Sequence, residues 1–363
     1  MKPSTRRPKS RYRPVAAALE ITLRCNMSCI HCGSDADHRE RPGHLDYDEW
    51  LGVIDELKKL GVRHITLSGG EPFLYPRWRD LVRYIKDRRT HVNFISNGYC
   101  VTEDDMRFMK SAGVEHVGVS LDGDEKTHDL IRRMPGSFRR VVGLFRLGRK
   151  YGVPVYPATS VNKVNLGVLE EVLRVVLDEE VKIWQVQIVN SFGRAGRMRE
   201  QMLLDPDQYV AVCDSILRWQ KELGERLRIM PADSVGYCHP VTDAILGDYE
   251  WQGCNAGMQV LGIQADGTVL GCLSLQDKSF AAGNVRQRPL SEIWRDDSAF
   301  AYTRRADASR LTGACRTCEG AANCKAGCLG MAFSITGTVS HNPYCYKAIV
   351  EKRAAPAPQP VPS

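Results

Sequence analysis

Apolar, β-branched runs alternate with amphipathic helical patterns between residues 16 and about 223, and this alternation constrains the fold more than any other feature of the 363-residue chain. The expected strands cover residues 17–23, 62–68, 91–96, 114–121, 153–161 and 182–189. The expected helices cover residues 46–60, 77–88, 103–112, 138–151, 166–178 and 205–223. Gly61, Gly113 and Gly152 stand after three of these helices, where glycine relieves the left-handed conformation of a C-terminal cap. The alternation predicts an α/β fold on a parallel sheet, either doubly wound or an incomplete barrel.

The organisation changes after residue 223, where glycine, cysteine and short irregular segments replace the alternation. We expect an α/β unit over residues 16–222, a linker over 223–253 and a small cysteine-rich α+β domain over 254–350. Residues 1–15 are basic and residues 351–363 are rich in proline and alanine, so both ends are predicted to be disordered. With 43% hydrophobic and 26% charged residues, the chain has the composition of a globular protein.

The formal net charge of +7 is concentrated at the N-terminus. Residues 1–13 contain six Lys and Arg and no acidic residue, so the other 350 residues carry about +1. A basic face that binds nucleic acid is therefore not expected. Glu20 and Arg24 interrupt the only apolar run that resembles a signal peptide, and no stretch approaches the ~20 apolar residues of a membrane span. We expect a cytoplasmic protein without membrane association.

The 13 cysteines are clustered rather than spread over the chain. Three lie within residues 25–32 and seven within 254–345, which leaves Cys100, Cys213 and Cys238 between them. A disulfide framework does not have this distribution. Clustered cysteines in a reducing compartment indicate thiolate ligands of metal sites.

Cys25, Cys29 and Cys32 form a C-x3-C-x2-C group directly after the first expected strand. Three thiolates on one short loop can hold three irons of a cubane cluster and leave the fourth iron without a protein ligand. Such an open metal position suits catalysis. A zinc site completed by His31 or His38 is the alternative that the spacing leaves open.

Polar groups recur at the carboxyl ends of the expected strands, which is where βα folds place their active sites. These groups are Gly69-Gly70-Glu71-Pro72 after the second strand, Asn97 after the third, Ser120-Leu121-Asp122 after the fourth and Gly193-Arg194 after the sixth. The two glycines of the first group would let a ligand approach the backbone, and Glu71 would accept a hydrogen bond from an ammonium group.

The C-x3-C-x2-C group together with Gly-Gly-Glu-Pro at residues 69–72 resembles the radical S-adenosylmethionine (SAM) enzymes. The resemblance covers about residues 16–222 and implies a partial (β/α)6 barrel of the TIM type. It also implies a [4Fe–4S] cluster whose open iron is chelated by the amino and carboxylate groups of SAM. One electron then cleaves SAM, and the resulting 5′-deoxyadenosyl radical abstracts a hydrogen atom from a substrate.

The resemblance also implies which residues bind SAM. Glu71 and the backbone of Gly69 and Gly70 would hold the methionyl ammonium group, and Ser120 would contact the ribose. These residues belong to the strand-end motifs named above.

Arg132 resembles an arginine that lies near the SAM carboxylate in this family, although Arg133 fits the spacing equally well. His31 takes the place of an aromatic residue and is expected to pack over the cluster rather than to bind it. Asp122 precedes Gly123 and is either part of this site or a turn former.

The C-terminal cysteines follow a second pattern. Cys254 and Cys272 are separated by 17 residues, a C-x2-C-x5-C-x3-C group runs from Cys315 to Cys328, and Cys345 follows after 16 more residues. Two zinc ribbons are one interpretation of such spacings. The order resembles the SPASM auxiliary-cluster domain, which lies C-terminal to radical SAM barrels, and the match covers about residues 254–346.

The SPASM resemblance implies two auxiliary [4Fe–4S] clusters, which makes three clusters in the chain. The nearer auxiliary cluster takes Cys254, Cys272 and Cys328, with either Cys238 or an open iron at the fourth position. The farther cluster takes Cys315, Cys318, Cys324 and Cys345. Metal loading is then expected to be coupled to the folding of this domain.

Two cysteines remain outside these sets. Cys213 shares a helix face with Tyr209 and Ile216, which predicts a core thiol. Cys100 follows the third strand at the barrel mouth and is either structural or a hydrogen donor that quenches a substrate radical.

The double resemblance implies post-translational modification of a ribosomal precursor peptide by a crosslink, a thioether or an epimerisation. Leu273 stands after Cys272, where sulfatase maturases have an acid, and argues against that activity. Expected partners are an electron donor such as flavodoxin or ferredoxin and a separate leader-binding protein, unless the basic N-terminus attracts an acidic leader. The alternatives are a radical SAM dehydrogenase or mutase acting on a small molecule or cofactor precursor, and a non-catalytic zinc or iron–sulfur electron-transfer protein.

Overall fold

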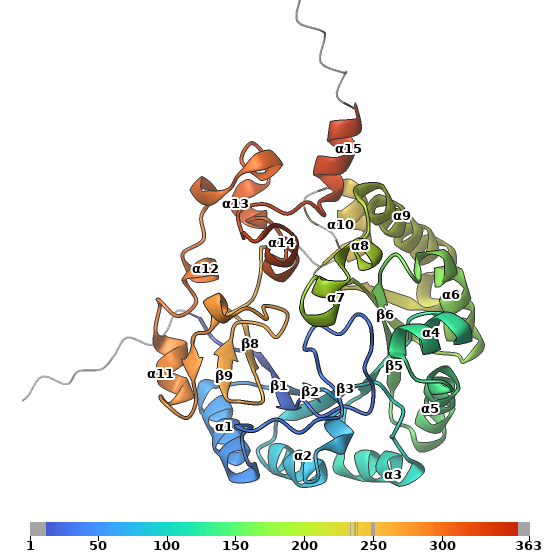
Figure 1. Ribbon diagram of the computed structural model, residues 1–363, viewed down its shortest axis with the longest axis vertical. Coiled ribbons are helices and arrows are strands. Elements are labelled where there is room, and N and C mark those ends of the chain that lie inside the picture. Colours follow the sequence, from blue (N-terminus) through green and yellow to red (C-terminus); the bar gives the residue numbers. More distant parts are fainter. Residues whose placement is uncertain (1–11, 233, 236, 238, 248–250, 355–363) are drawn as a thin grey trace, which may run out of the picture.

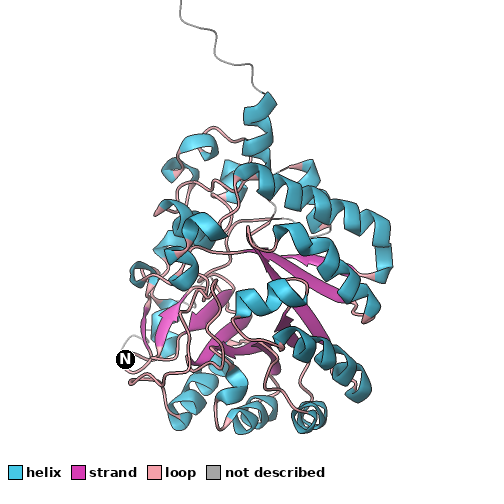
Figure 2. Cartoon of the chain, turned by 45° about the vertical axis from the view of Figure 1, so that its right-hand side comes forward, coloured by secondary structure: helices cyan, strands magenta, loops and turns pink. Residues whose placement is uncertain are grey.

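The computed structural model describes residues 12–232, 234–235, 237, 239–247 and 251–354. Within this part of the chain, ten strands form one open sheet in the order β10-β9-β8-β1-β2-β3-β4-β5-β6-β7. The strands of the barrel region are β1 (Ala16–Thr22), β2 (His64–Gly69), β3 (His91–Ser96), β4 (Val117–Ser120), β5 (Val155–Val161), β6 (Ile183–Ile188) and β7 (Arg228–Pro231). All neighbours in this series are parallel. The sheet curves into an arc with helices on its outer side, as Figures 1 and 2 show.

The connecting helices are α1 (Tyr47–Leu60), α2 (Trp78–Asp87), α3 (Glu103–Ala112), α4 (Glu125–Arg132), α5 (Ser137–Tyr151), α6 (Leu169–Asp178), α7 (Gly193–Arg197), α8 (Arg199–Met202) and α9 (Pro206–Leu223). Asp46, Thr102 and Asp205 begin α1, α3 and α9 with a capping box, in which the side chain accepts a hydrogen bond from a backbone N–H of the first turn. Local side-chain chemistry therefore fixes where these helices start.

The predicted α/β class and partial barrel are confirmed. β3 and α3 have the predicted bounds, and the other predicted strands and helices begin and end within three residues of the prediction. Gly61, Gly113 and Gly152 adopt φ values of 93°, 71° and 66°, as expected of C-terminal caps.

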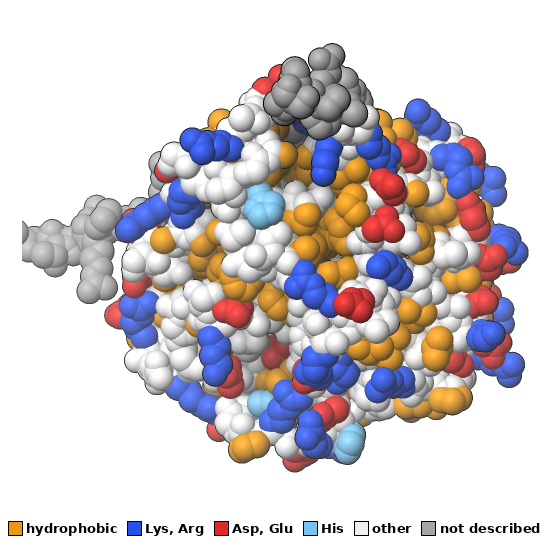
Figure 3. Space-filling view, turned by 45° about the horizontal axis from the view of Figure 1, so that its top comes forward, with side chains coloured by type: hydrophobic (Ala, Val, Ile, Leu, Met, Phe, Trp, Pro, Cys, Tyr) orange, Lys and Arg blue, Asp and Glu red, His pale blue; other side chains and the backbone are white. Residues whose placement is uncertain are grey.

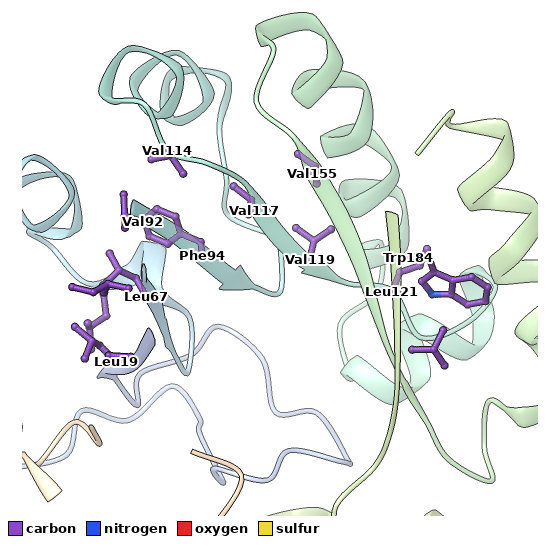
Figure 4. Packing of buried hydrophobic residues seen from close by; sticks show 14 of the residues in the cluster. Leu19, Leu67, Val92, Phe94, Val114, Val117, Val119, Leu121, Val155 and Trp184 are labelled. Atoms are coloured by element: carbon purple, nitrogen blue, oxygen red, sulfur yellow. The ribbon is translucent and has the colours of Figure 1, made fainter. Parts of the chain in front are cut away.

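The core lies between the sheet and its outer helices. Val117, Val119 and Trp184 are fully buried there and come from β4 and β6 (Figure 4). The indole of Trp184 donates to Thr159 Oγ1 at 2.8 Å, so its polar atom is satisfied inside the core. Cys213 is also fully buried, which confirms the predicted core thiol.

The C-terminal region extends the barrel sheet. Its strands are β8 (Val260–Ile263), β9 (Thr268–Leu270) and β10 (Gly283–Asn284). β8 pairs with β1 in parallel, so that segments about 245 residues apart lie side by side. β8 and β9 form a hairpin, with Gly267 at a φ of 86° in its turn. The helices of this region are α11 (Leu290–Arg295), α12 (Ala301–Arg304), α13 (Ala321–Cys324), α14 (Leu329–Thr336) and α15 (Tyr346–Ala354).

Three boundaries differ from the expectation. The segment 223–253, expected to be a linker, contains β7 and α10 (Pro240–Leu246), because a four-residue edge strand is too short to leave a periodic pattern. Residues 12–15 were assigned to the disordered arm, yet Val15 N donates to Gln259 O at 2.6 Å beside β8. At the other end, α15 extends into the predicted tail as far as residue 354.

The described residues contain no helix that is long and apolar enough to cross a membrane. On the face shown in Figure 3, Lys and Arg side chains are interspersed with Asp and Glu and do not gather in one basic patch.

Candidate functional site

The three-cysteine loop, residues 23–45, leaves the carboxyl end of β1 and returns before α1 begins. Cys25 N donates to Asp37 O at 2.6 Å, which closes the loop on itself. Cys25 and Cys29 are each 7% exposed, and Cys32 is half-buried. All three are free thiols and pack with Met27 in one cluster of the described residues. The loop therefore gathers the three predicted ligands at the mouth of the barrel.

Burial makes the thiols of Cys25 and Cys29 less acidic. It raises the pKa of Cys25 to about 12, and it raises the pKa of Cys29 although Arg132 acts in the opposite direction. Because such thiols ionise only when a cation replaces the proton, metal binding here would release protons and strengthen as the pH rises.

The surroundings of Cys25 and Cys29 suit sulfur ligands that carry negative charge, as in an iron–sulfur cluster. Asn97 Nδ2 lies 3.6 Å from Cys25 Sγ, and Arg132 Nη1 lies 3.8 Å from Cys29 Sγ. Donors at these distances stabilise sulfur that carries negative charge. Among the described residues, no three His, Cys, Asp or Glu side chains are placed to hold a single metal ion.

Asp122, Arg132 and His31 form a buried charged network beside the loop. Asp122 is fully buried; its carboxylate pairs with the guanidinium of Arg132 and lies 3.4 Å from His31 Nε2. Burial by itself would raise the pKa of Asp122, but Arg132 and His31 outweigh burial and hold this pKa below its ordinary value. Asp122 also accepts a hydrogen bond from Ser160 N at 3.0 Å. It is thus part of the site rather than a simple turn former.

The end of α4 separates the two candidate arginines. Arg132 is 8% exposed and faces the cysteine loop, whereas Arg133 adopts a φ of 50° as the C-cap of the helix and is exposed. One turn earlier, His128 Nδ1 accepts from Asp122 N at 3.1 Å, and burial lowers the pKa of His128 to about 4. His128 is therefore neutral at physiological pH and adds no positive charge beside Arg132.

Gly69 and Gly70 lie against the end of β1. A Cβ atom would come within 2.1 Å of Thr22 O at Gly69 and within 2.4 Å of Arg24 O at Gly70. Gly70 N and Glu71 N donate to these same two carbonyl oxygens, at 2.7 and 2.9 Å. The protein backbone that leads into the three-cysteine loop thus occupies the space beside both glycines, where the sequence suggested room for a ligand.

Glu71 is fully buried between β2 and β3. Its carboxylate accepts hydrogen bonds from Ser96 Oγ and Asn97 N, both at 2.8 Å, and from Phe73 N at 3.2 Å. Burial raises the pKa of Glu71 to about 7 despite these donors. Its protonation state can therefore change near neutral pH.

Ser120 and Cys100 also lie at the carboxyl edge of the sheet. Ser120 is the half-buried last residue of β4. Cys100 follows β3, and burial raises its pKa to about 12, with Glu71 and Cys25 among the nearby acidic groups that raise it further. Cys100 is therefore a neutral thiol close to the three-cysteine loop.

A cavity of about 630 Å³, here named the central cavity, lies between the barrel mouth and the C-terminal region. The barrel contributes His31, Ser68, Ser160, Gln185 and Gln187 to its lining, and the C-terminal region contributes Cys254, Cys272 and Cys328. None of the described residues that line it is Lys, Arg, Asp or Glu. The three-cysteine loop and the three cysteines assigned to the nearer auxiliary cluster thus face one space lined by both polar and apolar side chains.

A second cavity, of about 560 Å³, lies within the C-terminal region. Its lining includes Cys315, Cys318, Cys324 and Cys345, which are the four cysteines assigned to the farther cluster. The structure therefore separates the C-terminal cysteines into the two predicted sets. Cys238, the candidate fourth ligand of the nearer set, lies outside the described residues.

Two contacts of the cysteine loop were not expected from the sequence. Asn97 Nδ2 reaches Cys25 Sγ and also Asn26 Oδ1 at 2.7 Å. Arg194 Nε donates to Cys29 O at 2.6 Å from α7. Both residues belong to strand-end motifs that the sequence did point to, but no local pattern shows that they turn toward the loop.

Sequence comparisons place the chain in a known family. Residues 19–176 match the radical SAM superfamily, and residues 254–319 match SPASM, an iron–sulfur cluster-binding domain. The chain is 30% identical over 345 residues to the AdoMet-dependent heme synthase of Methanosarcina barkeri, an alignment that covers 92% of this chain and 96% of the relative. The chain belongs to the radical SAM superfamily and carries a C-terminal SPASM domain.

Two further likenesses agree with this assignment. The chain is 27% identical over 358 residues to the mycofactocin maturase MftC of Mycobacterium ulcerans, covering 95% of this chain and 93% of the relative. The crystal structure of Streptococcus suis SuiB bound to S-adenosylmethionine superposes with a TM-score of 0.73 at 15% identity, covering 91% of this chain and 76% of that one. The predicted radical SAM enzyme class is confirmed, and the alternative of a non-catalytic electron-transfer protein is not supported.

Proposed function

We propose that this enzyme modifies a precursor peptide within the central cavity. The observation that carries the proposal is the lining of that cavity, which joins the three-cysteine loop to Cys254, Cys272 and Cys328 and contains no charged side chain among its described residues, imidazole aside. Gln187 Nε2 donates to Ser160 Oγ at 2.8 Å, and Gln185 Nε2 donates to Gln187 Oε1 at 3.1 Å. Amide and hydroxyl groups held in this way match the donors and acceptors of a peptide backbone.

The proposed cofactors are SAM and three [4Fe–4S] clusters. Cys25, Cys29 and Cys32 would hold the SAM-binding cluster. The auxiliary clusters would be held by Cys254, Cys272 and Cys328, with Cys238 or an open iron, and by Cys315, Cys318, Cys324 and Cys345. When bound, the first cluster and SAM supply a 5′-deoxyadenosyl radical that abstracts a hydrogen atom from the substrate.

The protein's own residues would set up this chemistry. We assign Arg132 to the carboxylate of SAM, because its buried guanidinium faces Cys29 and its Nε is buried without a hydrogen-bond partner in the described part of the chain. Glu71 and the backbone of Gly69 and Gly70 would serve the methionyl ammonium, and Ser120 the ribose. Since the carboxylate of Glu71 already accepts three hydrogen bonds from protein donors, we expect it to keep these and to accept a further one from the ammonium group of SAM.

Cys100 is the proposed hydrogen donor, because a neutral thiol beside the loop carries the hydrogen atom that a radical quench needs. If it serves in this way, Cys100→Ala abolishes product formation but leaves SAM cleavage intact. Cys213→Ala is the matched control, since that thiol is fully buried in the core. Unchanged product from the Cys100 variant would remove this role.

The enzyme would need a partner that donates electrons and a means of binding the leader of its substrate. An electron donor such as flavodoxin or ferredoxin would supply the reducing electron in a reducing cytoplasm. A leader-binding protein, or the basic residues at the N-terminus, would hold an acidic leader of the substrate. Leader binding that is independent of salt and of residues 1–13 would exclude the second of these.

A second candidate is the conversion of a small molecule or cofactor precursor, and it is favoured by the 30% identity to an enzyme named heme synthase. A haem-type molecule carries carboxylates, and the described lining offers them no Lys or Arg side chain, so burying them there is costly. The lining of the central cavity therefore favours the peptide.

The test uses the full-length enzyme, purified without oxygen. Metal analysis should give about twelve irons per chain if three cubane clusters are present. Short peptides encoded beside the gene are then co-expressed with the enzyme and examined by mass spectrometry, in parallel with a haem-precursor assay. A peptide that loses hydrogen or epimerises supports the proposal, conversion of the haem precursor alone supports the second candidate, and zinc in place of iron overturns both.

A further inference from the structure

Helix α7 lies directly over the three-cysteine loop, as the ribbon in Figure 1 shows. Gly193, its first residue, has a φ of 53°. A Cβ atom there would come within 2.3 Å of Gly33 O and 2.5 Å of Cys32 O. Only glycine permits this approach, so the helix begins in backbone contact with the loop.

Arg194 makes four hydrogen bonds to the loop. Its backbone N–H donates to Cys32 O at 2.9 Å. Its guanidinium donates to Cys29 O at 2.6 Å, to Ala36 O at 2.8 Å and to Asp35 Oδ1 at 3.0 Å. The side chain is 14% exposed, so little water competes for these acceptors.

We infer that Arg194 is a positioning residue that holds the three-cysteine loop in the shape that accepts its cluster, an inference that rests on the cluster assigned to this loop under the proposed function. Its four bonds span the segment from Cys29 to Ala36, which contains two of the three thiols. Without them, two buried carbonyl groups lose a charged donor, and the segment regains freedom that cluster binding must then remove. Mutation of a residue that orients metal ligands in this way typically lowers the metal affinity about 10–100-fold.

The segment around α7 also contacts the C-terminal region through groups that do not involve Arg194. The ring of Phe192 stacks on Phe333 with centroids 6.5 Å apart, and Arg199 donates to Ile335 O in α14. A change confined to Arg194 leaves these contacts in place. The C-terminal cysteines therefore serve as an internal control in the same molecule.

Arg197 offers a matched control on the same helix. It pairs with Asp35 at 2.7 and 3.2 Å, but its side chain is 61% exposed, and its guanidinium pairs with that carboxylate rather than with the loop carbonyl groups bound by Arg194. Arg197→Gln removes a charge of the same kind from the same region. It does not remove the bonds to Cys29 O and Ala36 O.

The experiment compares wild type, Arg194→Gln, Arg194→Lys and Arg197→Gln as full-length chains reconstituted anaerobically with iron and sulfide. Iron per chain and the electron paramagnetic resonance spectrum of the reduced protein are measured with and without SAM. We expect Arg194→Gln to fall from about twelve to about eight irons and to lose the SAM-dependent spectral change. Arg194→Lys should recover little, because an ammonium group cannot span the same acceptors, and Arg197→Gln should behave as wild type.

Full iron content and a wild-type response to SAM in Arg194→Gln would overturn the inference. If Arg194→Gln does not fold, as judged by circular dichroism, Arg194→Lys carries the test with the same two outcomes. A wild-type protein that shows no SAM-dependent spectrum, or keeps it in Cys29→Ala, would instead refute the proposed function.

Discussion

Cys25 and Cys29 each expose 7% of their surface, whereas all seven cysteines of the C-terminal sets are partly exposed. The first two lie in a loop that is contacted by Asn97 after β3, by Arg132 from α4 and by Arg194 from α7. The C-terminal cysteines lie on elements as short as α13, which has four residues. The barrel thus imposes a shape on its cysteines, whereas the C-terminal region relies more on what the cysteines bind.

The turn after Cys324 contains two residues in the left-handed conformation. Lys325 and Ala326 follow Cys324 with φ values of 51° and 70°, and neither is glycine. A left-handed conformation costs about 1–2 kcal/mol for each such residue. Ligation of Cys324 and Cys328 on either side would offset this cost, so we expect the metal to hold the turn in place.

The largest expected effect is on SAM cleavage, which should depend on the cysteines of the barrel and not on those of the C-terminal region. Cys29→Ala should abolish reductive SAM cleavage, because it removes a ligand of the only cluster expected to bind SAM. Cys318→Ala, in the farther set, should leave SAM cleavage measurable while product formation falls. Anaerobic assays of 5′-deoxyadenosine and of product check both variants. Loss of SAM cleavage in both would mean that the two regions do not work separately.

Removal of the metal should destabilise the C-terminal region much more than the barrel. Chelation should expose the backbone amides of residues 313–346 to hydrogen exchange, because binding of a structural metal is worth on the order of 10 kcal/mol to a small domain. The amides of β2 to β5, paired in a sheet and packed in the core, should keep their protection. Exchange followed by mass spectrometry, with the iron-loaded protein as control, measures the difference. Equal loss of protection in both regions would contradict the comparison.

The sequence predicted the barrel well because its signals are local. The bounds of β3 and α3 follow from hydrophobic periodicity and from the Thr102 cap, which act within a few residues. The pairing of β8 with β1 was not predictable, since nothing in either segment specifies a partner about 245 residues away. The strand β7 was not predicted, because its four residues are too few to show a periodic pattern.

The candidate site was also predicted only in part from the sequence. The spacing of the cysteines indicated which thiols gather, and the two cavities agree with that grouping. The sequence did not show which contacts hold the three-cysteine loop in place. The Arg194 bond to Cys29 O joins residues 165 positions apart, and Asp122 became part of the site only because α4 returns Arg132 to it.

The ion pair between Asp122 and Arg132 should determine how firmly the barrel holds the three-cysteine loop. Asp122→Asn leaves the guanidinium of Arg132 buried without its carboxylate, which typically costs about 3–5 kcal/mol. Asp104→Asn breaks an exposed pair with Arg107 and should cost less than about 1 kcal/mol. Urea unfolding of the metal-free variants, followed by tryptophan fluorescence, gives both values. Because the pKa of Asp122 is held below its ordinary value, the carboxylate contributes fully to the free energy of unfolding above that ordinary pKa. This contribution is lost only in strong acid. Equal costs for the two variants would show that the network does not brace the loop.

The smallest expected effect lies at the junction of the two regions. Glu20 of β1 is 2% exposed and accepts from Ala265 N in the β8–β9 turn at 3.3 Å. Burial raises its pKa from 4.5 to about 7. Below pH 4.5 the carboxyl group is protonated in the folded and unfolded chain alike. Between pH 4.5 and 7 only the folded chain retains the proton, so the free energy of unfolding falls as the pH rises, by up to about 3 kcal/mol.

Glu20→Gln should remove this decline, because the amide stays neutral and can still accept from Ala265 N. The variant should match wild type at pH 4.5 and exceed it at pH 8 in urea unfolding. Glu103→Gln is the control, since its exposed carboxyl group has a lowered pKa and its removal should not stabilise the protein. Identical pH dependence in wild type and Glu20→Gln would show that this carboxyl group does not titrate with folding. If the decline is instead removed, and hydrogen exchange shows that β8 loosens at pH 8 while β3 does not, then the regions differ in stability although they share one sheet.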